Sequence, residues 1–194
     1  MTPATPLRAN RGIVLVTTLI LLLIMTVLGI SALRATTLEE RMSGNWRDRN
    51  LALQAAEAGL RSGERFIGPL TVAPTPHAYP CTGDQSCEVF DPADSSKRPT
   101  EGGLMSSNAA DREEWAQQSR EYDRDEDSGR DVPGTAALPR YLIEHRGHIR
   151  DHLVTGFGSA HETGRDQYRI TARGTGQTAV SRSVLQSLYI KRYN

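Results

Sequence analysis

Residues 13–33 read IVLVTTLILLLIMTVLGISAL, a run of 21 residues that contains no charged side chain. An α-helix rises about 1.5 Å per residue, so the run spans roughly 31 Å and can cross a bilayer core of about 30 Å. The apolar part of a secretory signal has only about 7–15 residues, and no A-x-A cleavage site follows this run. The run therefore predicts a transmembrane helix that remains part of the exported protein.

The charges that flank this run predict its orientation. Arg8 and Arg11 precede it, and no acidic residue lies near them. Positive residues stay on the cytoplasmic side of a membrane, so the N-terminus is expected there. Residues 34–194 are then expected outside, in the periplasm of a cell that has two membranes, with one span as the anchor.

The whole-chain composition excludes several functions. The 194 residues include 23 Lys+Arg and 23 Asp+Glu, so the net charge is zero and bulk binding to nucleic acid is not expected. Two cysteines are too few for a disulfide scaffold or a structural zinc cage. No motif frames a catalytic nucleophile and no phosphate-binding loop is present, so the sequence predicts neither an enzyme nor a cofactor.

The helix is expected to continue far beyond the membrane. No proline occurs from residue 13 to residue 67, and apolar side chains recur at helical spacing. We predict one helix of about 55 residues, with a transmembrane half at 13–33 and an amphipathic half at 34–67. A membrane helix followed by a separate surface helix is the alternative. The predicted packing face consists of Leu38, Met42, Trp46, Leu53 and Leu60.

The remainder of the chain predicts a small α+β domain. Prolines and polar residues make 68–139 a loop-rich region, with one short helix around 109–122. Strand patterns occur in 140–145, 166–173 and 180–190, and the glycine-rich turn at 174–178 predicts that the last two form an antiparallel hairpin. A hairpin needs a partner for its apolar face, so residues 140–194 are expected to form a small antiparallel sheet against the amphipathic half of the helix.

Two further sites follow from residue type and spacing. Cys81 and Cys87 enclose five residues, and such close cysteines normally pair in an oxidising compartment, so we predict a disulfide that shapes the chain locally. Residues 111–131 carry a net charge of −5, with nine acids and four arginines. The favoured interpretation is a solvated acidic loop.

Calcium is the alternative for this acidic segment, with candidate ligands Asp123, Asp125, Asp127 and Asp131. The spacing argues against it, because Ser128 and Gly134 stand where a calcium loop has glycine and a bidentate glutamate. His145, His148 and His152 also lie close together, but their strand-like surroundings do not place them on one helical face. No metal site is predicted there.

The N-terminal region resembles the type IV prepilin family. A basic residue, a glycine and a charge-free run occur in that order at Arg11, Gly12 and Ile13. The stretch RATTLEERMSGNWRDRNLALQAAEA at 34–58 looks like PilX-type minor pilins, and YRITARGTG at 168–176 resembles their last strands. The resemblance implies a pilin-like fold, a leader at 1–12, cleavage between Gly12 and Ile13, and N-methylation of Ile13.

Thr17 departs from the family pattern. Major pilins carry glutamate as the fifth mature residue, where its carboxylate neutralises the terminal amine of a neighbouring subunit. A charged amine in apolar surroundings costs several kcal/mol unless it is paired. A subunit without this carboxylate suits the tip of a filament; a neutral substitution in a low-copy subunit is the alternative.

The resemblance therefore predicts a minor pilin that primes or caps type IV pilus assembly in a low-abundance complex at the pilus tip. The implied partners are other minor pilins, the major pilin, the prepilin peptidase, the inner-membrane assembly platform and a tip adhesin. Two alternatives remain open: a type II secretion pseudopilin of the tip complex, and an uncleaved single-pass periplasmic binding or sensor protein.

Overall fold

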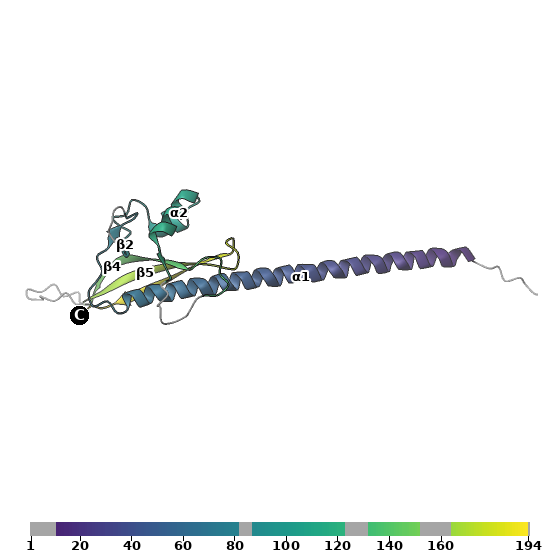
Figure 1. Cartoon of the computed structure of the whole chain (residues 1–194), viewed down its shortest axis with the longest axis horizontal. Helices are drawn as coiled ribbons and strands as arrows, with labels where there is room; N and C mark the ends of the chain where they lie inside the picture. Colours follow the sequence, from purple (N-terminus) through teal and green to yellow (C-terminus); the bar gives the residue numbers. More distant parts are fainter. Residues whose placement is uncertain (1–10, 82–86, 123–131, 152–163, 194) are drawn as a thin grey trace, which may run out of the picture. The chain divides into compact units, whose positions relative to one another are not determined.

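The computed structural model describes residues 11–81, 87–122, 132–151 and 164–193. The chain divides into two compact units, residues 1–46 and 47–194. The elements, in chain order, are α1 (Arg11–Ile67), β1 (His77–Ala78), β2 (Val89–Asp91), the π-helix η1 (Pro99–Leu104), α2 (Ala109–Gln118), β3 (Arg120–Glu121), β4 (Arg140–Arg150), β5 (Gly164–Thr175) and β6 (Arg182–Lys191) (Figure 1).

Helix α1 is one continuous helix of 57 residues, as predicted. No proline interrupts it, and each internal glycine costs only about 1 kcal/mol relative to alanine, which tertiary packing can offset. Its residues 11–46 belong to the first unit and its residues 47–67 to the second.

The sheet of the second unit has six strands, in the order β1-β2-β4-β5-β6, with β3 beside β4. The predicted hairpin is confirmed, since β5 and β6 pair antiparallel from Asp166–Lys191 to Thr175–Arg182. Strand β4 is antiparallel to β5, but β2 runs parallel to β4 and β1 runs parallel to β2. The α+β fold is confirmed, and the sheet is mixed because the region before residue 140 adds strands to it.

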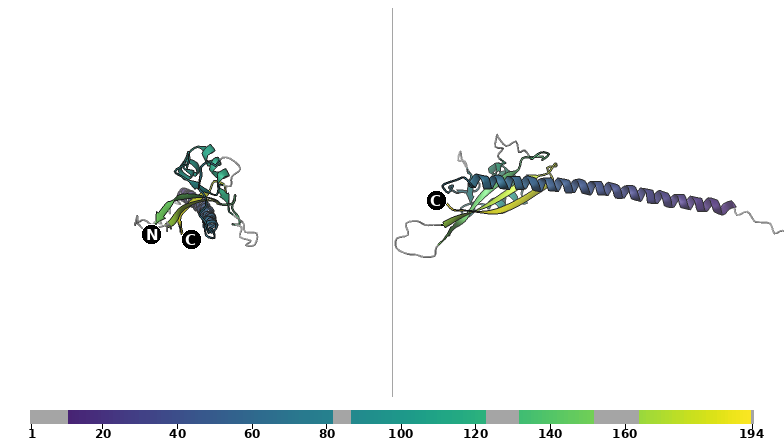
Figure 2. Two further views of the ribbon diagram at one scale, coloured as in Figure 1. Left: turned by 90° about the vertical axis from the view of Figure 1, so that its left-hand side faces the viewer. Right: turned by 90° about the horizontal axis from the view of Figure 1, so that it is seen from below.

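Both faces of the sheet are covered (Figure 2). The end of α1 packs on one face, over a cluster that includes Tyr141, Tyr168 and Ile170. On the opposite face, Trp115 of α2 and Leu104 of η1 pack against Leu142 of β4. The alternation in 168–173 predicted one solvent-facing side, but Thr171 on that side is fully buried because η1 and α2 cover it.

The packing face of α1 differs from the predicted one. The side chains of Leu38, Met42 and Trp46 are 59%, 71% and 69% exposed, and Leu53 is 38% exposed; Leu60 alone packs partly against the core. The buried face consists instead of small residues and one isoleucine: Ala52, Ala55, Ala56, Gly59, Ser62, Gly63 and Ile67. Small side chains allow the helix backbone to lie close to the strands.

The closest approach between α1 and the sheet occurs at glycines. A Cβ on Gly174 of β5 would lie 2.2 Å from the backbone nitrogen of Ala56 and 2.4 Å from the carbonyl oxygen of Ala52. A Cβ on Gly63 would lie 2.6 Å from Cγ2 of Ile170. Real Cβ contacts are longer, so Gly174 has no room for a side chain beside the backbone of α1, and a side chain at Gly63 would require Ile170 to shift.

Asp48 joins α1 to the turn between β5 and β6. Its carboxylate accepts hydrogen bonds from the backbone N–H of Gln177 at 2.5 Å and from the hydroxyl of Thr178 at 2.6 Å. The hydroxyl of Thr178 is the main cause that holds the pKa of Asp48 below its usual value, with backbone N–H groups adding to it. These bonds fix the turn to the helix.

Candidate functional site

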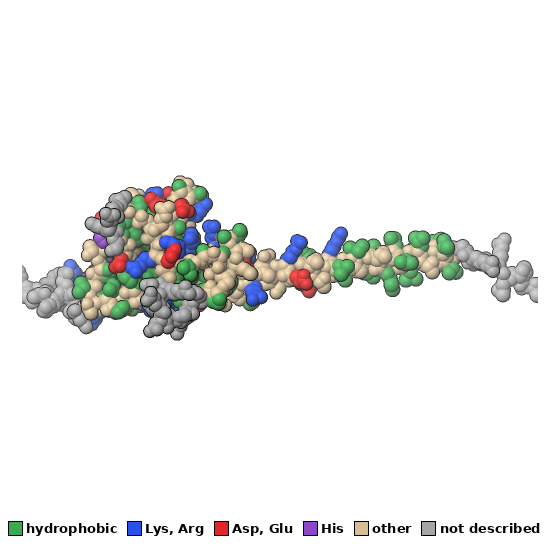
Figure 3. Space-filling view, in the orientation of Figure 1, with side chains coloured by type: hydrophobic (Ala, Val, Ile, Leu, Met, Phe, Trp, Pro, Cys, Tyr) green, Lys and Arg blue, Asp and Glu red, His purple; other side chains and the backbone are tan. Residues whose placement is uncertain are grey.

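The first candidate surface is the N-terminal part of α1. From Ile13 to Leu33 its side chains are exposed, and no Lys, Arg, Asp or Glu interrupts the hydrophobic surface (Figure 3). By length and composition, α1 is the single described helix apolar enough to cross a membrane. A helix that is apolar on every side must be covered by lipid or by other apolar helices.

Thr17 is neutral and internally satisfied in this segment. Its hydroxyl donates to the carbonyl oxygen of Ile13 at 3.1 Å or to that of Val14 at 3.0 Å. Such bonds within the helix remove the cost of exposing a hydroxyl to an apolar environment. The position therefore offers no carboxylate to a neighbouring cation. The cleavage between Gly12 and Ile13 and the methylation of Ile13 stay predictions.

The predicted cysteine pair forms a disulfide between Cys81 and Cys87, with a Cα–Cα distance of 6.3 Å. The side-chain amide of Gln118 accepts from the backbone N–H of Cys81 and donates to its carbonyl, both at 3.1 Å. Because Gln118 is the last residue of α2, these bonds attach the disulfide to α2.

Two of the histidines considered as metal ligands, His145 and His148, meet at one carboxylate. A bulge in β4 between His145 and Gly147 turns His145 and His148 to the same face of the sheet, although they are three residues apart. His145 Nε2 lies 3.1 Å and His148 Nδ1 lies 3.2 Å from the same oxygen of Asp166. The sequence reasoning missed this arrangement; the signal was Gly147, whose φ of 122° permits the bulge.

These residues do not form a metal centre. Within the described parts of the chain, no three His, Cys, Asp or Glu side chains are arranged to hold an ion. His152 and the calcium candidates Asp123, Asp125, Asp127 and Asp131 lie outside the described residues.

A buried ion pair on the other face holds η1 to the sheet. Glu144 is fully buried, and its two carboxylate oxygens accept from Nε and Nη2 of Arg169 at 2.7 and 2.6 Å. The hydroxyl of Thr100 in η1 donates to the same carboxylate at 2.9 Å. Hydrogen bonding to Glu144 raises the pKa of Arg169, so the guanidinium stays charged and the contact has a structural role.

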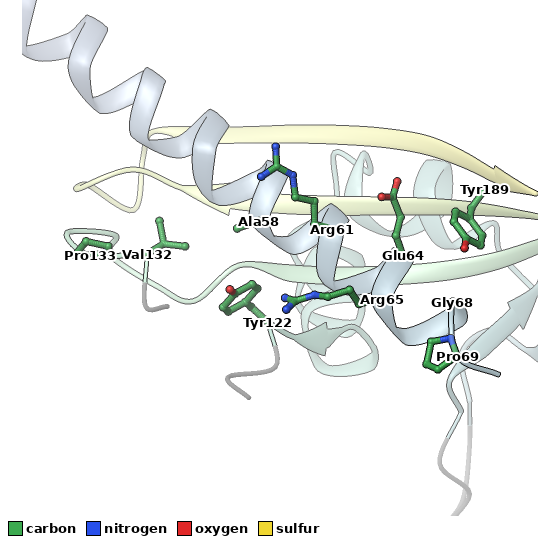
Figure 4. Close-up of a pocket in the computed structure, with 10 residues that line it drawn as sticks. All are labelled: Ala58, Arg61, Glu64, Arg65, Gly68, Pro69, Tyr122, Val132, Pro133 and Tyr189. Carbon is green, nitrogen blue, oxygen red and sulfur yellow. The ribbon is translucent and has the colours of Figure 1, made fainter. Parts of the chain in front are cut away.

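A groove of about 740 Å³ lies along the exposed side of the last turns of α1. In the close-up view, Arg65 extends toward Tyr122, and Glu64 projects toward Tyr189 of β6 (Figure 4). Arg61 is exposed and lies 3.8 Å from Glu57, while Glu64 accepts from the hydroxyl of Ser187 at 3.1 Å. The groove therefore combines aromatic rings with guanidinium groups, which is typical of a surface that binds protein rather than of a catalytic centre.

An apolar N-terminal helix that continues into an α+β domain is the layout of a pilin. Two family models match the chain: the PilX N-terminal model at residues 11–61 and the type IV pilus assembly protein PilX C-terminal model at residues 80–191. The chain belongs to the PilX family of type IV pilus assembly proteins. No curated protein and no solved structure matches it.

Membership in this family makes the chain a component of type IV pilus assembly. The family is one of structural subunits, which agrees with a site made of surfaces rather than reacting groups. The long apolar helix fits single-pass anchoring in a membrane.

Proposed function

We propose that this protein is a minor pilin that primes type IV pilus assembly from a low-abundance complex at the pilus tip. The observation that carries the proposal is Thr17, which is neutral and satisfies its hydroxyl within the helix. In major pilins, the glutamate at the fifth mature position pairs with the terminal amine of the neighbouring subunit. A subunit that lacks this carboxylate fits the first position, where no earlier subunit has to be paired.

The maturation step precedes assembly. The prepilin peptidase cuts between Gly12 and Ile13, and the new terminus at Ile13 is N-methylated. The mature chain begins with the apolar segment 13–33, which stays in the inner membrane while the domain at 47–194 stands in the periplasm.

Assembly is driven by transfer of the apolar helix from lipid to the filament core. Lipid tails are as apolar as leucine, so close packing and hydrogen bonds decide the transfer. Beyond the membrane, the exposed Leu38, Met42 and Trp46 form an apolar face that other pilin helices can cover. The partners in this step are other minor pilins, the major pilin, the assembly platform and a tip adhesin.

Deletion of the gene tests this role. We expect surface pili to disappear although major pilin is still made, and to return with the wild-type gene. Normal numbers of pili in the deletion strain would overturn the priming role. Mass spectrometry of the membrane-extracted protein tests the maturation: methylated Ile13 supports the pilin, and an intact Met1 indicates an uncleaved membrane anchor.

A further inference from the structure

Strand β6 ends the sheet and leaves one long edge open. It has ten residues, Arg182–Lys191, and the strand order stops there. Within the described parts of the chain, no hydrogen bond from another element reaches the backbone of Leu188 or Ile190. An open edge of this length can pair with another strand.

The hydrogen-bond pattern shows which backbone groups face outward. The N–H of Gly176 donates to the carbonyl of Ser181 at 2.9 Å, and the strands continue in register from that pair. Bonded pairs alternate along an antiparallel ladder, so residues 183, 185, 187, 189 and 191 bond to β5. The N–H and C=O groups of Leu188, Ile190 and the other even-numbered residues point away from the sheet.

Most of the usual protections of an edge strand are missing from β6, although Arg182 and Lys191 place a charge at each end. Natural edges are blunted by proline, bulges, short length or charges that point inward. Strand β6 has no proline, glycine or acidic residue, and its pairing with β5 has no bulge. Leu188 and Ile190 are 59% and 48% exposed on the face opposite α1, beside the open backbone groups. This edge suits an added strand with apolar side chains at alternate positions.

The charges around the edge select the partner. Arg182 and Lys191 lie in β6, and Arg192 follows directly. Neighbouring acids offset part of this charge, since Asp151 pairs with Arg192 and Glu64 accepts from Ser187. Arg61 is paired with Glu57 on the α1 face, and Lys191 donates its ammonium group to the carbonyl oxygens of Ile67 and Gly68. Arg182 lies on the same face of β6 as Leu188 and Ile190. Burial and the nearby charge of Arg182 lower the pKa of Arg173, so two guanidinium groups lie together at that end of the strand. The face that carries Leu188 and Ile190 is therefore basic at its Arg182 end.

We infer that the outer edge of β6 accepts an extended acidic and apolar segment of another polypeptide by strand addition. The inference deepens the proposed assembly role by naming the contact through which the domain recruits a partner. Backbone bonds to the even-numbered residues give affinity, apolar side chains cover Leu188 and Ile190, and carboxylates pair with the basic end at Arg182. The test below uses purified protein, so its outcome does not depend on whether the chain primes pili.

The probe is a fluorescent peptide of the same length as β6 that alternates valine and glutamate. Anisotropy is measured with the full chain in detergent micelles. We expect saturable binding that weakens with salt, and binding at least about tenfold weaker for a valine–lysine peptide. Failure of the valine–glutamate peptide to bind would overturn the inference, and equal binding of the lysine peptide would overturn the acidic chemistry.

The matched variants are Leu188→Pro and Leu188→Ala. Proline removes an outward N–H and fills its place with a ring, while the ladder to β5 is kept; alanine removes the side chain but keeps the N–H. We expect Leu188→Pro to abolish binding and Leu188→Ala to retain most of it. A peptide with N-methylated amides gives a check on the wild-type chain: its equal binding would contradict strand addition. If the chain forms a dimer and Leu188→Pro dissociates it, a second copy of the chain is the partner. That result would overturn the assignment of an acidic segment of another polypeptide.

Discussion

The contact of Gly174 with α1 gives the most specific prediction about stability. In Gly174→Ala the new Cβ meets backbone atoms of Ala52 and Ala56 within 2.2 to 2.4 Å, and backbone cannot rotate away as a side chain can. Overpacking costs about 1–3 kcal/mol, and at a backbone contact we take the upper end. Alanine in a strand recovers about 0.5–1 kcal/mol of glycine's entropy. The net loss in free energy of unfolding is therefore about 2 kcal/mol.

Two glycines of α1, Gly63 and Gly44, complete the series of Gly→Ala substitutions. Gly63→Ala places a Cβ 2.6 Å from a methyl group of Ile170, which can shift, and gains about 1 kcal/mol of helix propensity. Its net cost is expected to be smaller than that of Gly174→Ala. Gly44→Ala is the control, because nothing lies within 4 Å of its Cβ.

The assay is urea unfolding of the oxidised full chain in detergent, followed by the fluorescence of buried Trp115, with Trp46 replaced by phenylalanine throughout. The expected order of destabilisation is Gly174→Ala, then Gly63→Ala, with no loss for Gly44→Ala. The close approach of α1 and β5 would be refuted if Gly174→Ala unfolded at the wild-type urea concentration. Equal losses for Gly44→Ala and Gly174→Ala would also refute it.

Three further predictions concern charged or polar positions. Asp48→Asn should lower the stability of the protein at pH 7. The folded state lowers the pKa of Asp48, so the stabilisation by its carboxylate is present above the usual pKa of aspartate and is lost as the pH falls through the lowered pKa; the variant should therefore lose less stability than wild type on acidification. Thermal unfolding at several pH values checks this, and parallel pH profiles of the two proteins would contradict it. Glu144→Gln should cost about 3 kcal/mol in urea unfolding, because it leaves the charge of Arg169 without its partner. The exposed Glu113→Gln is its control and should change stability little. Thr17→Glu should allow the subunit to enter pilus shafts, and immunogold labels confined to pilus ends would count against this account of Thr17.

Much of the architecture could be predicted because it depends on local periodicity. The charge-free run and the absence of proline predict the long helix, and the alternation of Tyr168, Ile170 and Ala172 predicts a strand in the hairpin. The parallel pairing of β2 with β4 could not be predicted, because it joins Val89 to Ile143 across a loop-rich region that carries no pattern of its own.

The prediction of the packing face of α1 was wrong for a physical reason. A search for large apolar side chains finds Leu38, Met42 and Trp46. The helix instead buries alanine and glycine, because their small side chains allow its backbone to lie close to the strands. The spacing of Ala52, Ala56, Gly59 and Gly63, three or four residues apart, was the available signal. The long apolar residues Leu38, Met42 and Trp46 lie N-terminal to this buried stretch and are exposed.

The histidine pair shows a similar gap between pattern and structure. Regular alternation would put His145 and His148 on opposite faces, and the bulge at Gly147 puts them on one. The disulfide was predictable because the chain has two cysteines separated by five residues, and cysteines this close normally pair in an oxidising compartment.

The position of the protein in the pilus tests the central claim most directly. Pili sheared from cells are labelled with gold through an antibody against residues 47–194 and viewed by electron microscopy. The account predicts labels at one end of the filaments, in numbers far below those of the major pilin. Labels spread evenly along the shafts at major-pilin abundance would contradict it.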